Sequence, residues 1–299
     1  MSSYSNYNPF ARRESHGPHS LTAYRVLAPL SWALVVVIGI FYSIHKPSDV
    51  SNGWPIWSQL ERRFTAFSVN VVVVAIYWVL LLLSQIGYLV QLYSKEEAFV
   101  NSAANAASHF ILNNLFVVAW ILLWVRNHFW PAEVILIVHF IHQHVAFWRI
   151  RSLPPLSHLA VIAAPYAWVL IALFWTGASA VWSHTPAAEI AANVFIWILF
   201  VIGLVHVSAT VDELLGYSLS LLTFGLAVAQ TDRKSSFPRQ WIFAWVIFGV
   251  FLLDSVYLSA VKHSGRDAFF RSSGEPEPIQ SDPERAPLLP EQREPATTS

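Results

Sequence analysis

Residues 66–92 read AFSVNVVVVAIYWVLLLLSQIGYLVQL and contain no Asp, Glu, Lys or Arg. About 20 apolar residues in helical form are enough to cross the hydrocarbon core of a bilayer. Seven other stretches are similarly apolar, with at most one charged residue each, and eleven of the 14 tryptophans lie within the eight. The predicted spans are residues 25–45, 66–92, 109–125, 132–148, 159–182, 190–207, 214–229 and 241–261.

The composition of the chain agrees with this pattern. Of 299 residues, 55% are hydrophobic and only 12% are charged, whereas soluble domains carry about 25% charged residues. The alternation of polar and apolar residues that marks barrel strands is absent, and helices are then the remaining way to satisfy the backbone in lipid. The sequence therefore predicts an all-α, polytopic transmembrane helical bundle of about eight spans within residues 24–263.

The two ends of the chain differ from this core. Residues 1–23 are polar and predict a disordered N-terminal arm, and residues 264–299 predict a disordered tail rich in proline and acid. Neither end can bury enough apolar surface to fold alone. The seventh predicted span, residues 214–229, is the weakest, because Gly216, Tyr217, Ser218 and Ser220 make its start less apolar. The sequence does not settle whether this segment crosses the membrane. The two termini lie on the same side of the membrane if it does and on opposite sides if it does not.

Several function classes lose support from composition alone. Lys plus Arg and Asp plus Glu number 18 each, so no basic excess indicates a nucleic-acid partner. The chain has no cysteine, which excludes disulfides, thiolate metal sites and cysteine nucleophiles. No phosphate-binding glycine loop, dinucleotide fingerprint or nucleophile elbow is present. The pattern favours a protein that is not an enzyme, it names no cofactor, and membrane lipid is the expected surrounding.

The spacing of the deep tryptophans suggests a binding site. Trp120 and Trp124 are four residues apart, and Trp168 and Trp175 are seven apart, so each pair shares one helix face. Two such faces on neighbouring helices would line a groove for a flat apolar ligand. The leading hypothesis is therefore binding, sensing or movement of a small apolar or amphipathic molecule. Packing or contact with lipid is the alternative interpretation of the same residues.

Two polar side chains inside the spans are candidate anchors for that ligand. Asp254 is an acid well inside the last predicted span, and Asn114 lies one and a half turns before Trp120. A polar group inside a membrane is expected to face the bundle interior and to bind a partner or a ligand. A buried hydrogen bond that fixes helix packing is the alternative for both.

A cluster of histidines is the second chemical candidate. His139 and His142 lie on one helix face, and His109 and Asp254 come from other spans. Imidazoles at this spacing can ligate a metal or relay protons. This predicts, as an alternative function, an intramembrane metal-dependent hydrolase. The competing interpretation is that these histidines face water at the headgroup level.

The tail contains a candidate sorting signal. Glu284 precedes the pair Leu288 and Leu289 by four residues, the acidic dileucine pattern that clathrin-type adaptors bind. A third hypothesis is therefore a scaffold of the vacuolar or endosomal membrane that is sorted by its tail. In that case the deep tryptophans would have no ligand.

Two family resemblances are carried by short motifs. The segments YNPFARRE (residues 7–14), APLSW (28–32) and SHFILNN (108–114) resemble a fungal family of multi-pass membrane proteins of unknown function. This resemblance implies a fungal source and no known activity. The segment AWILLW (119–124), with YAW (166–168), is similar to the longer members of the tryptophan-rich sensory, or translocator, family.

The second resemblance covers roughly residues 66–230. It implies a five-helix bundle that binds porphyrins or sterols in an aromatic groove. Matched residue by residue, it carries ligand contact to Trp120, Trp124 and Trp168.

Overall fold

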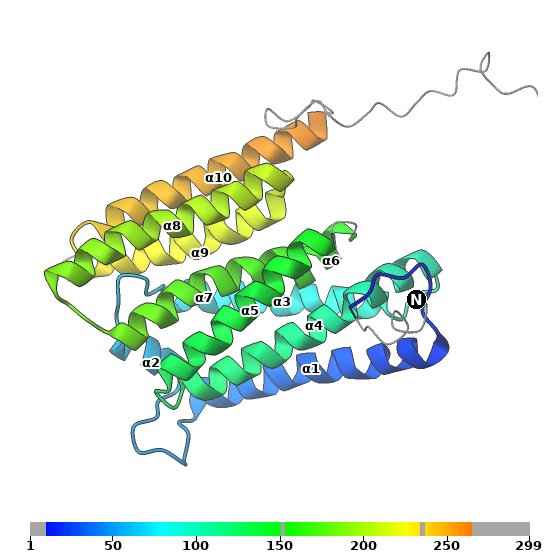
Figure 1. Cartoon of the computed structure of the whole chain (residues 1–299), viewed down its shortest axis with the longest axis horizontal. Helices are drawn as coiled ribbons and strands as arrows, with labels where there is room; N and C mark the ends of the chain where they lie inside the picture. The colour runs from blue at the N-terminus through cyan, green and yellow to red at the C-terminus, as the bar shows by residue number, and fades with distance from the viewer. Residues whose placement is uncertain (1–9, 151–152, 234–236, 265–299) are drawn as a thin grey trace, which may run out of the picture.

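In the computed structural model, which describes residues 10–150, 153–233 and 237–264, the chain forms a helical bundle (Figure 1). No strand occurs within these residues. The elements are α1 (Pro18–Ile44), α2 (Ile56–Arg62), α3 (Val71–Gln91), α4 (Glu97–Trp124), α5 (Phe129–Arg149), α6 (Pro155–His158), the π-helical turn η2 (Leu159–Ala163), α7 (Ala164–Val181), α8 (Pro186–Thr210), α9 (Glu213–Asp232) and α10 (Gln240–Ser264).

The long helices run antiparallel to their chain neighbours, and they form two groups. Helices α1, α3, α4, α5 and α7 make one group, and α8, α9 and α10 make a second layer beside it (Figure 1). Helix α9 joins them because it packs against α7 and α3. Helix α1 begins and α10 ends at the same end of the bundle, which we call the terminal end.

Seven helices in the described residues are long and apolar enough to cross a membrane. They are α1, α3, α4, the continuous rod of α6, η2 and α7, and then α8, α9 and α10. The chain is therefore a multi-pass membrane protein. The seventh predicted span forms α9, which belongs to this set although two-thirds of its most apolar window is buried inside the protein (67%).

The fourth predicted span, residues 132–148, forms α5, which is long enough at 21 residues but is not among the seven apolar helices. Its polar residues His139 and Gln143 are buried against the bundle. Its opposite face exposes an apolar stripe that includes Val134 and Ile141. A helix that turns its polar side toward protein and its apolar side outward suits a bilayer despite a low mean hydropathy, so α5 fits as a further crossing.

The first helix begins earlier than expected. Helix α1 starts at Pro18, so residues 18–23, which were predicted to belong to a disordered arm, are helical. Proline is favoured at the first helical position because its missing N–H would have no partner there. Within the described residues before it, Arg13 is hydrogen-bonded to Asn105 of α4. At least this part of the predicted arm is therefore docked on the bundle.

The end of the bundle opposite the terminal end is closed by the segment between α1 and α3. The Arg126 guanidinium donates to the Asp49 carboxylate over 2.8 Å, and the Trp54 N–H donates to the Val125 carbonyl over 3.0 Å. The Arg62 guanidinium lies 3.5 Å from the Trp54 ring centroid, a cation–π contact. These contacts hold the short helix α2 against the ends of α1 and α4.

Candidate ligand-binding site

Five tryptophans from three helices meet inside the first group. The ring centroids of Trp120 and Trp124 of α4 are 5.6 Å apart, and the Trp124 and Trp175 centroids are 4.6 Å apart. Trp168 of α7 lies 5.6 Å from Trp120 and 5.0 Å from Trp78 of α3. These separations are typical of interacting aromatic rings. The two predicted tryptophan pairs therefore form one cluster, as their spacing on each helix indicated.

The cluster is rigidly held. The Trp120 indole N–H donates to Thr176 Oγ1 over 3.1 Å, which fixes that ring across the gap between α4 and α7. The four rings of α4 and α7 are all buried, and Trp124 is fully enclosed. The planes of Trp120 and Trp168 are inclined by 78°, and those of Trp120 and Trp175 by 59°. Aromatic rings locked in this way form a rigid apolar wall of inclined faces, and a ligand that packs on them costs little side-chain entropy.

An apolar groove of about 210 Å³ opens beside this wall. Its floor is formed by Trp120, Trp168 and Trp175, and the rest of its lining comes from α1, α2, α3 and Ile121 of α4. Ile40 of α1 and Val79 of α3 line it and are themselves exposed on the outer surface of the bundle. The mouth of the groove therefore faces the lipid between α1 and α3.

Two residues of α1 are important in the groove: Gly39 leaves it open, and Ser43 contributes a hydroxyl group. Gly39 lines it, and a Cβ atom built on Gly39 would meet no other atom within 4 Å. Ser43, one turn further along, lines it near the α2 end and donates its hydroxyl to the Gly39 carbonyl over 2.7 Å. The lone pairs of the Ser43 oxygen can still accept a hydrogen bond. Neither residue stood out in the sequence.

The predicted polar anchors lie elsewhere. Asn114 is buried and donates to Ser31 Oγ over 3.2 Å, and it is not among the residues that line the groove. Asp254 is on α10, in the second layer, where it accepts a hydrogen bond from Ser208 over 3.4 Å. The expectation that one of them joins the tryptophans is therefore not met, and both make helix–helix hydrogen bonds instead. Trp124 also lies outside the lining, behind Trp120 and Trp175.

The predicted histidine cluster is partly brought together. The rings of His109 and His142 stack with centroids 5.0 Å apart. His139 donates from Nε2 to Asn113 Oδ1 over 2.8 Å, and Gln143 donates to the same oxygen over 2.6 Å. Among the described residues, no three His, Cys, Asp or Glu side chains are arranged to hold a metal ion. The proposed metal hydrolase has no geometric basis in this part of the chain.

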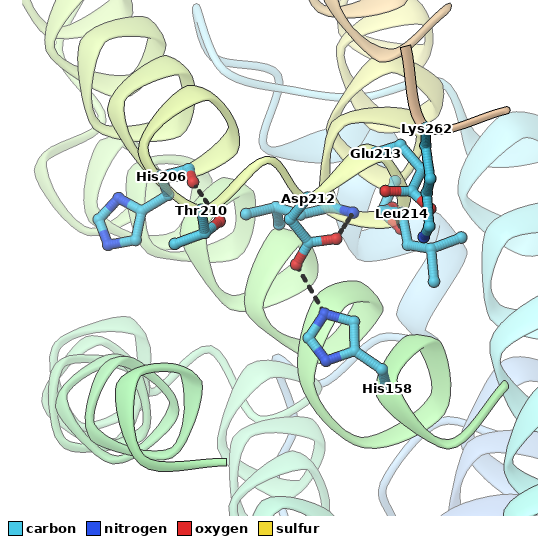
Figure 2. A network of polar contacts seen from close by, with 9 residues as sticks. His158, His206, Thr210, Asp212, Glu213, Leu214 and Lys262 are labelled. Carbon is cyan, nitrogen blue, oxygen red and sulfur yellow. Dashed lines mark hydrogen bonds and ion pairs between the residues drawn. The ribbon is translucent and has the colours of Figure 1, made fainter. Parts of the chain in front are cut away.

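A polar network at the terminal end was not predicted. His158 Nε2 lies 2.6 Å from Asp212 Oδ2, and Asp212 Oδ1 accepts from the Leu215 N–H at the start of α9. Figure 2 shows the His158 ring pointing at the Asp212 carboxylate from the helix below the α8–α9 turn. Two turns further along the same helical rod, the Tyr166 hydroxyl lies 3.0 Å from His206 Nε2. An acid directly before a helix is a capping signal, and it was the available sequence clue to Asp212.

The sorting residues Glu284, Leu288 and Leu289 lie outside the described residues. The same holds for most of the predicted tail, which begins at residue 264.

The comparisons with known proteins bear on the second layer. A family model described as "Fungal protein of unknown function (DUF1774)" matches residues 189–289. The match begins in the first turn of α8 and includes α9 and α10. Neither the comparison with curated proteins nor that with solved structures finds a match.

The family match supports the resemblance to a fungal family of unknown function, although on residues other than the motifs that first indicated it. No comparison supports the resemblance to the tryptophan-rich sensory family. Over its last three helices, the chain is thus similar to a family of fungal proteins whose function is unknown.

Proposed function

We propose that this membrane protein binds a small, rigid, mainly apolar molecule that enters the tryptophan groove sideways from the bilayer. The observation that carries the proposal is the groove itself. Three buried indole rings floor an apolar space whose mouth lies between lipid-facing residues of α1 and α3. Ligand sites in proteins combine an apolar lining with few polar groups, and this groove has that composition.

The size of the groove limits what part of a ligand it takes. Sites that enclose a drug-sized molecule typically measure about 300–1,000 Å³, whereas this groove measures about 210 Å³. It therefore holds one edge of a fused ring system, with the rest of the molecule in lipid. A sterol suits this description better than a porphyrin, because a sterol presents a narrow, rigid edge of rings.

The position of Ser43 gives the ligand an orientation. Ser43 lies in the last turn of α1, and it lines the groove together with Ile56 of α2. A ligand with a single hydroxyl would donate it to the Ser43 oxygen, with its rings directed along Gly39 toward the tryptophans. Such a hydrogen bond contributes about 0.5–1.5 kcal/mol.

The test is a titration of the protein in lipid nanodiscs with dehydroergosterol, a fluorescent sterol that accepts energy from tryptophan. We expect saturable energy transfer whose midpoint moves to higher sterol concentration in Trp120→Leu. The control is Trp245→Leu, since Trp245 is on α10 and outside the groove. Midpoints are compared rather than amplitudes, because each variant also loses one donor. Non-saturable transfer in all three proteins would refute the proposal.

Localisation to a vacuolar or endosomal membrane stays a prediction based on Glu284, Leu288 and Leu289. Its test is the distribution of a fluorescently tagged chain with both leucines changed to alanine. Relocation to another membrane is expected if an adaptor reads this motif, and an unchanged distribution would contradict it. This outcome is independent of sterol binding.

A further inference from the structure

A second and larger cavity lies at the terminal end, far along α4 from the tryptophan groove. It measures about 590 Å³ and is lined by Phe10, by residues 12–14, by the first half of α4 and by the end of α5. Its volume falls within the range of about 300–1,000 Å³ found for small-molecule sites. It is thus large enough for a polar group of several atoms rather than for a single ion.

The lining of this cavity is basic. Arg12 and Arg13 come from the N-terminal segment and Arg149 from the last turn of α5, whereas Glu14 is the acidic residue in the lining. Asn101 of α4 adds an amide. Guanidinium groups pair with phosphate oxygens in a two-pronged geometry, and amides add neutral donors. The donor set matches a phosphate-bearing anion.

A single side chain fixes the arginine pair over the cavity. Asn105 Oδ1 accepts from the Arg13 backbone N–H over 2.8 Å, and Asn105 Nδ2 donates to the Arg13 carbonyl over 3.0 Å. His16 Nε2 also donates to Asn105 Oδ1, over 3.1 Å. The Phe10 ring lies 4.9 Å from the His109 ring, centroid to centroid. Asn105 therefore acts as a clamp that positions a segment which sequence alone would leave free.

The cavity lies at the depth of lipid headgroups. Helix α4 has 28 residues, so it is about 42 Å long, against about 30 Å for the hydrocarbon core. Its apolar residues are toward its end, so the surplus of roughly two turns falls at its start, which includes Asn101. At the end of α5, the exposed Trp148 precedes Arg149, and tryptophan there is typical of the membrane–water interface.

We propose that this cavity binds the phosphate-bearing headgroup of an anionic membrane lipid, held by Arg12, Arg13 and Arg149. Asn105 is a positioning residue, since it holds the N-terminal segment rather than the headgroup. The same chemistry would recognise a soluble phosphate ester, and the experiment separates the two sources.

The experiment uses the full-length protein in detergent micelles and microscale thermophoresis. The probes are dioctanoyl phosphatidylinositol 4-phosphate, dioctanoyl phosphatidylcholine as the lipid without net charge, and inositol 1,4-bisphosphate as the soluble ester. We expect the phosphoinositide to bind more tightly than either. Equal binding of phosphatidylcholine would overturn the proposal. Binding of the soluble bisphosphate as tight as that of the lipid would overturn the lipid source.

Three variants locate the site. Arg12→Gln combined with Arg149→Gln should weaken phosphoinositide binding by about tenfold or more. Lys95→Gln removes an exposed charge that does not line the cavity, and it should change affinity by no more than about twofold. Unchanged affinity in the double variant, or an equal loss in Lys95→Gln, would overturn the proposal.

Asn105→Ala tests the clamp. Alanine is a better helix former than asparagine, so α4 should stay folded, and a thermal unfolding scan checks this. We expect phosphoinositide affinity to fall although every arginine remains. The single variant Arg12→Gln gives an independent measurement of phosphoinositide affinity. Because Arg12 lies outside all helices, this substitution should not disturb the folding of the bundle. Wild-type affinity in both variants would refute the assignment.

Discussion

Replacing Gly39 by leucine should close the tryptophan groove without disturbing the fold. Gly39 lines the groove, and a Cβ there meets nothing within 4 Å. The added side chain therefore enters space that the ligand would occupy, rather than a neighbouring helix. Glycine in a helix interior costs roughly 0.5–1 kcal/mol relative to alanine, so the variant should be at least as stable as the wild type.

The expected loss of affinity follows from what the ligand touches. Because the ligand comes from lipid, moving it into the groove gains little from the hydrophobic effect. The gain comes from packing on aromatic faces, about 0.5–1.5 kcal/mol for each aromatic contact. Exclusion from two of the three floor rings, Trp120 and Trp168, would cost about 1–3 kcal/mol, which is roughly a 5- to 150-fold weaker affinity.

The assay is energy transfer from tryptophan to dehydroergosterol in nanodiscs, with Gly249→Leu as the matched control. Gly249 is a helical glycine of α10 with equally open space around its Cβ, and it does not line the groove. Both variants should unfold at or above the wild-type temperature, and only Gly39→Leu should bind sterol more weakly. A wild-type midpoint in Gly39→Leu, or the same shift in Gly249→Leu, would refute the reasoning.

Three further predictions concern the groove, the helix packing and the opposite end of the bundle. Ser43→Ala should weaken the binding of a sterol with a free hydroxyl by about tenfold or less, and it should not change the binding of the methyl ether of the same sterol. The control Ser84→Ala, at a residue outside the groove, should change the affinity for neither sterol. If Ser43→Ala weakened the binding of both sterols equally, Ser43 would not be the anchor of the hydroxyl. Gly203→Val should destabilise the second layer, since a Cβ at this position would come within 2.7 Å of the Phe251 ring of α10. A thermal unfolding midpoint no lower than that of the wild type would contradict this close packing. The Arg126 guanidinium donates a hydrogen bond to the Asp49 carboxylate and lowers its pKa. The ion pair therefore stabilises the fold fully at a pH above about 3.9, the pKa of a free aspartate. This contribution disappears as the pH falls through the lowered pKa of Asp49 in the folded protein. The unfolding midpoints of wild type and Asp49→Asn should therefore differ at pH 7 and converge in strong acid, and a difference that does not depend on pH would exclude the ion pair as its cause.

Much of the fold follows from local pattern. Apolar runs long enough to cross a bilayer predict the long helices, because in lipid each backbone group must be satisfied within its own helix. The docking of Arg13 on the bundle did not follow, since a segment with polar residues becomes ordered only through partners such as Asn105. Nor did hydropathy reveal that α5 turns His139 and Gln143 inward, because that depends on which neighbours cover them.

The site was predictable only in part. Helical spacings of four and seven residues placed Trp120 with Trp124 and Trp168 with Trp175, and the structure joins both pairs. The polar anchor was not predictable, because an acid such as Asp254 can face the interior of either helix group. The importance of Gly39 depends on the distance between α1 and α3, which no local pattern encodes.

The most direct test of ligand binding in the groove is photolabelling with a diazirine sterol, followed by mapping of the labelled peptides by mass spectrometry. Labels should concentrate on residues 35–43 of α1 and 74–82 of α3, which line the mouth, and Gly39→Leu should remove them. Labels spread over all lipid-facing helices, α10 included, and unchanged in Gly39→Leu would mean that the tryptophans serve packing alone.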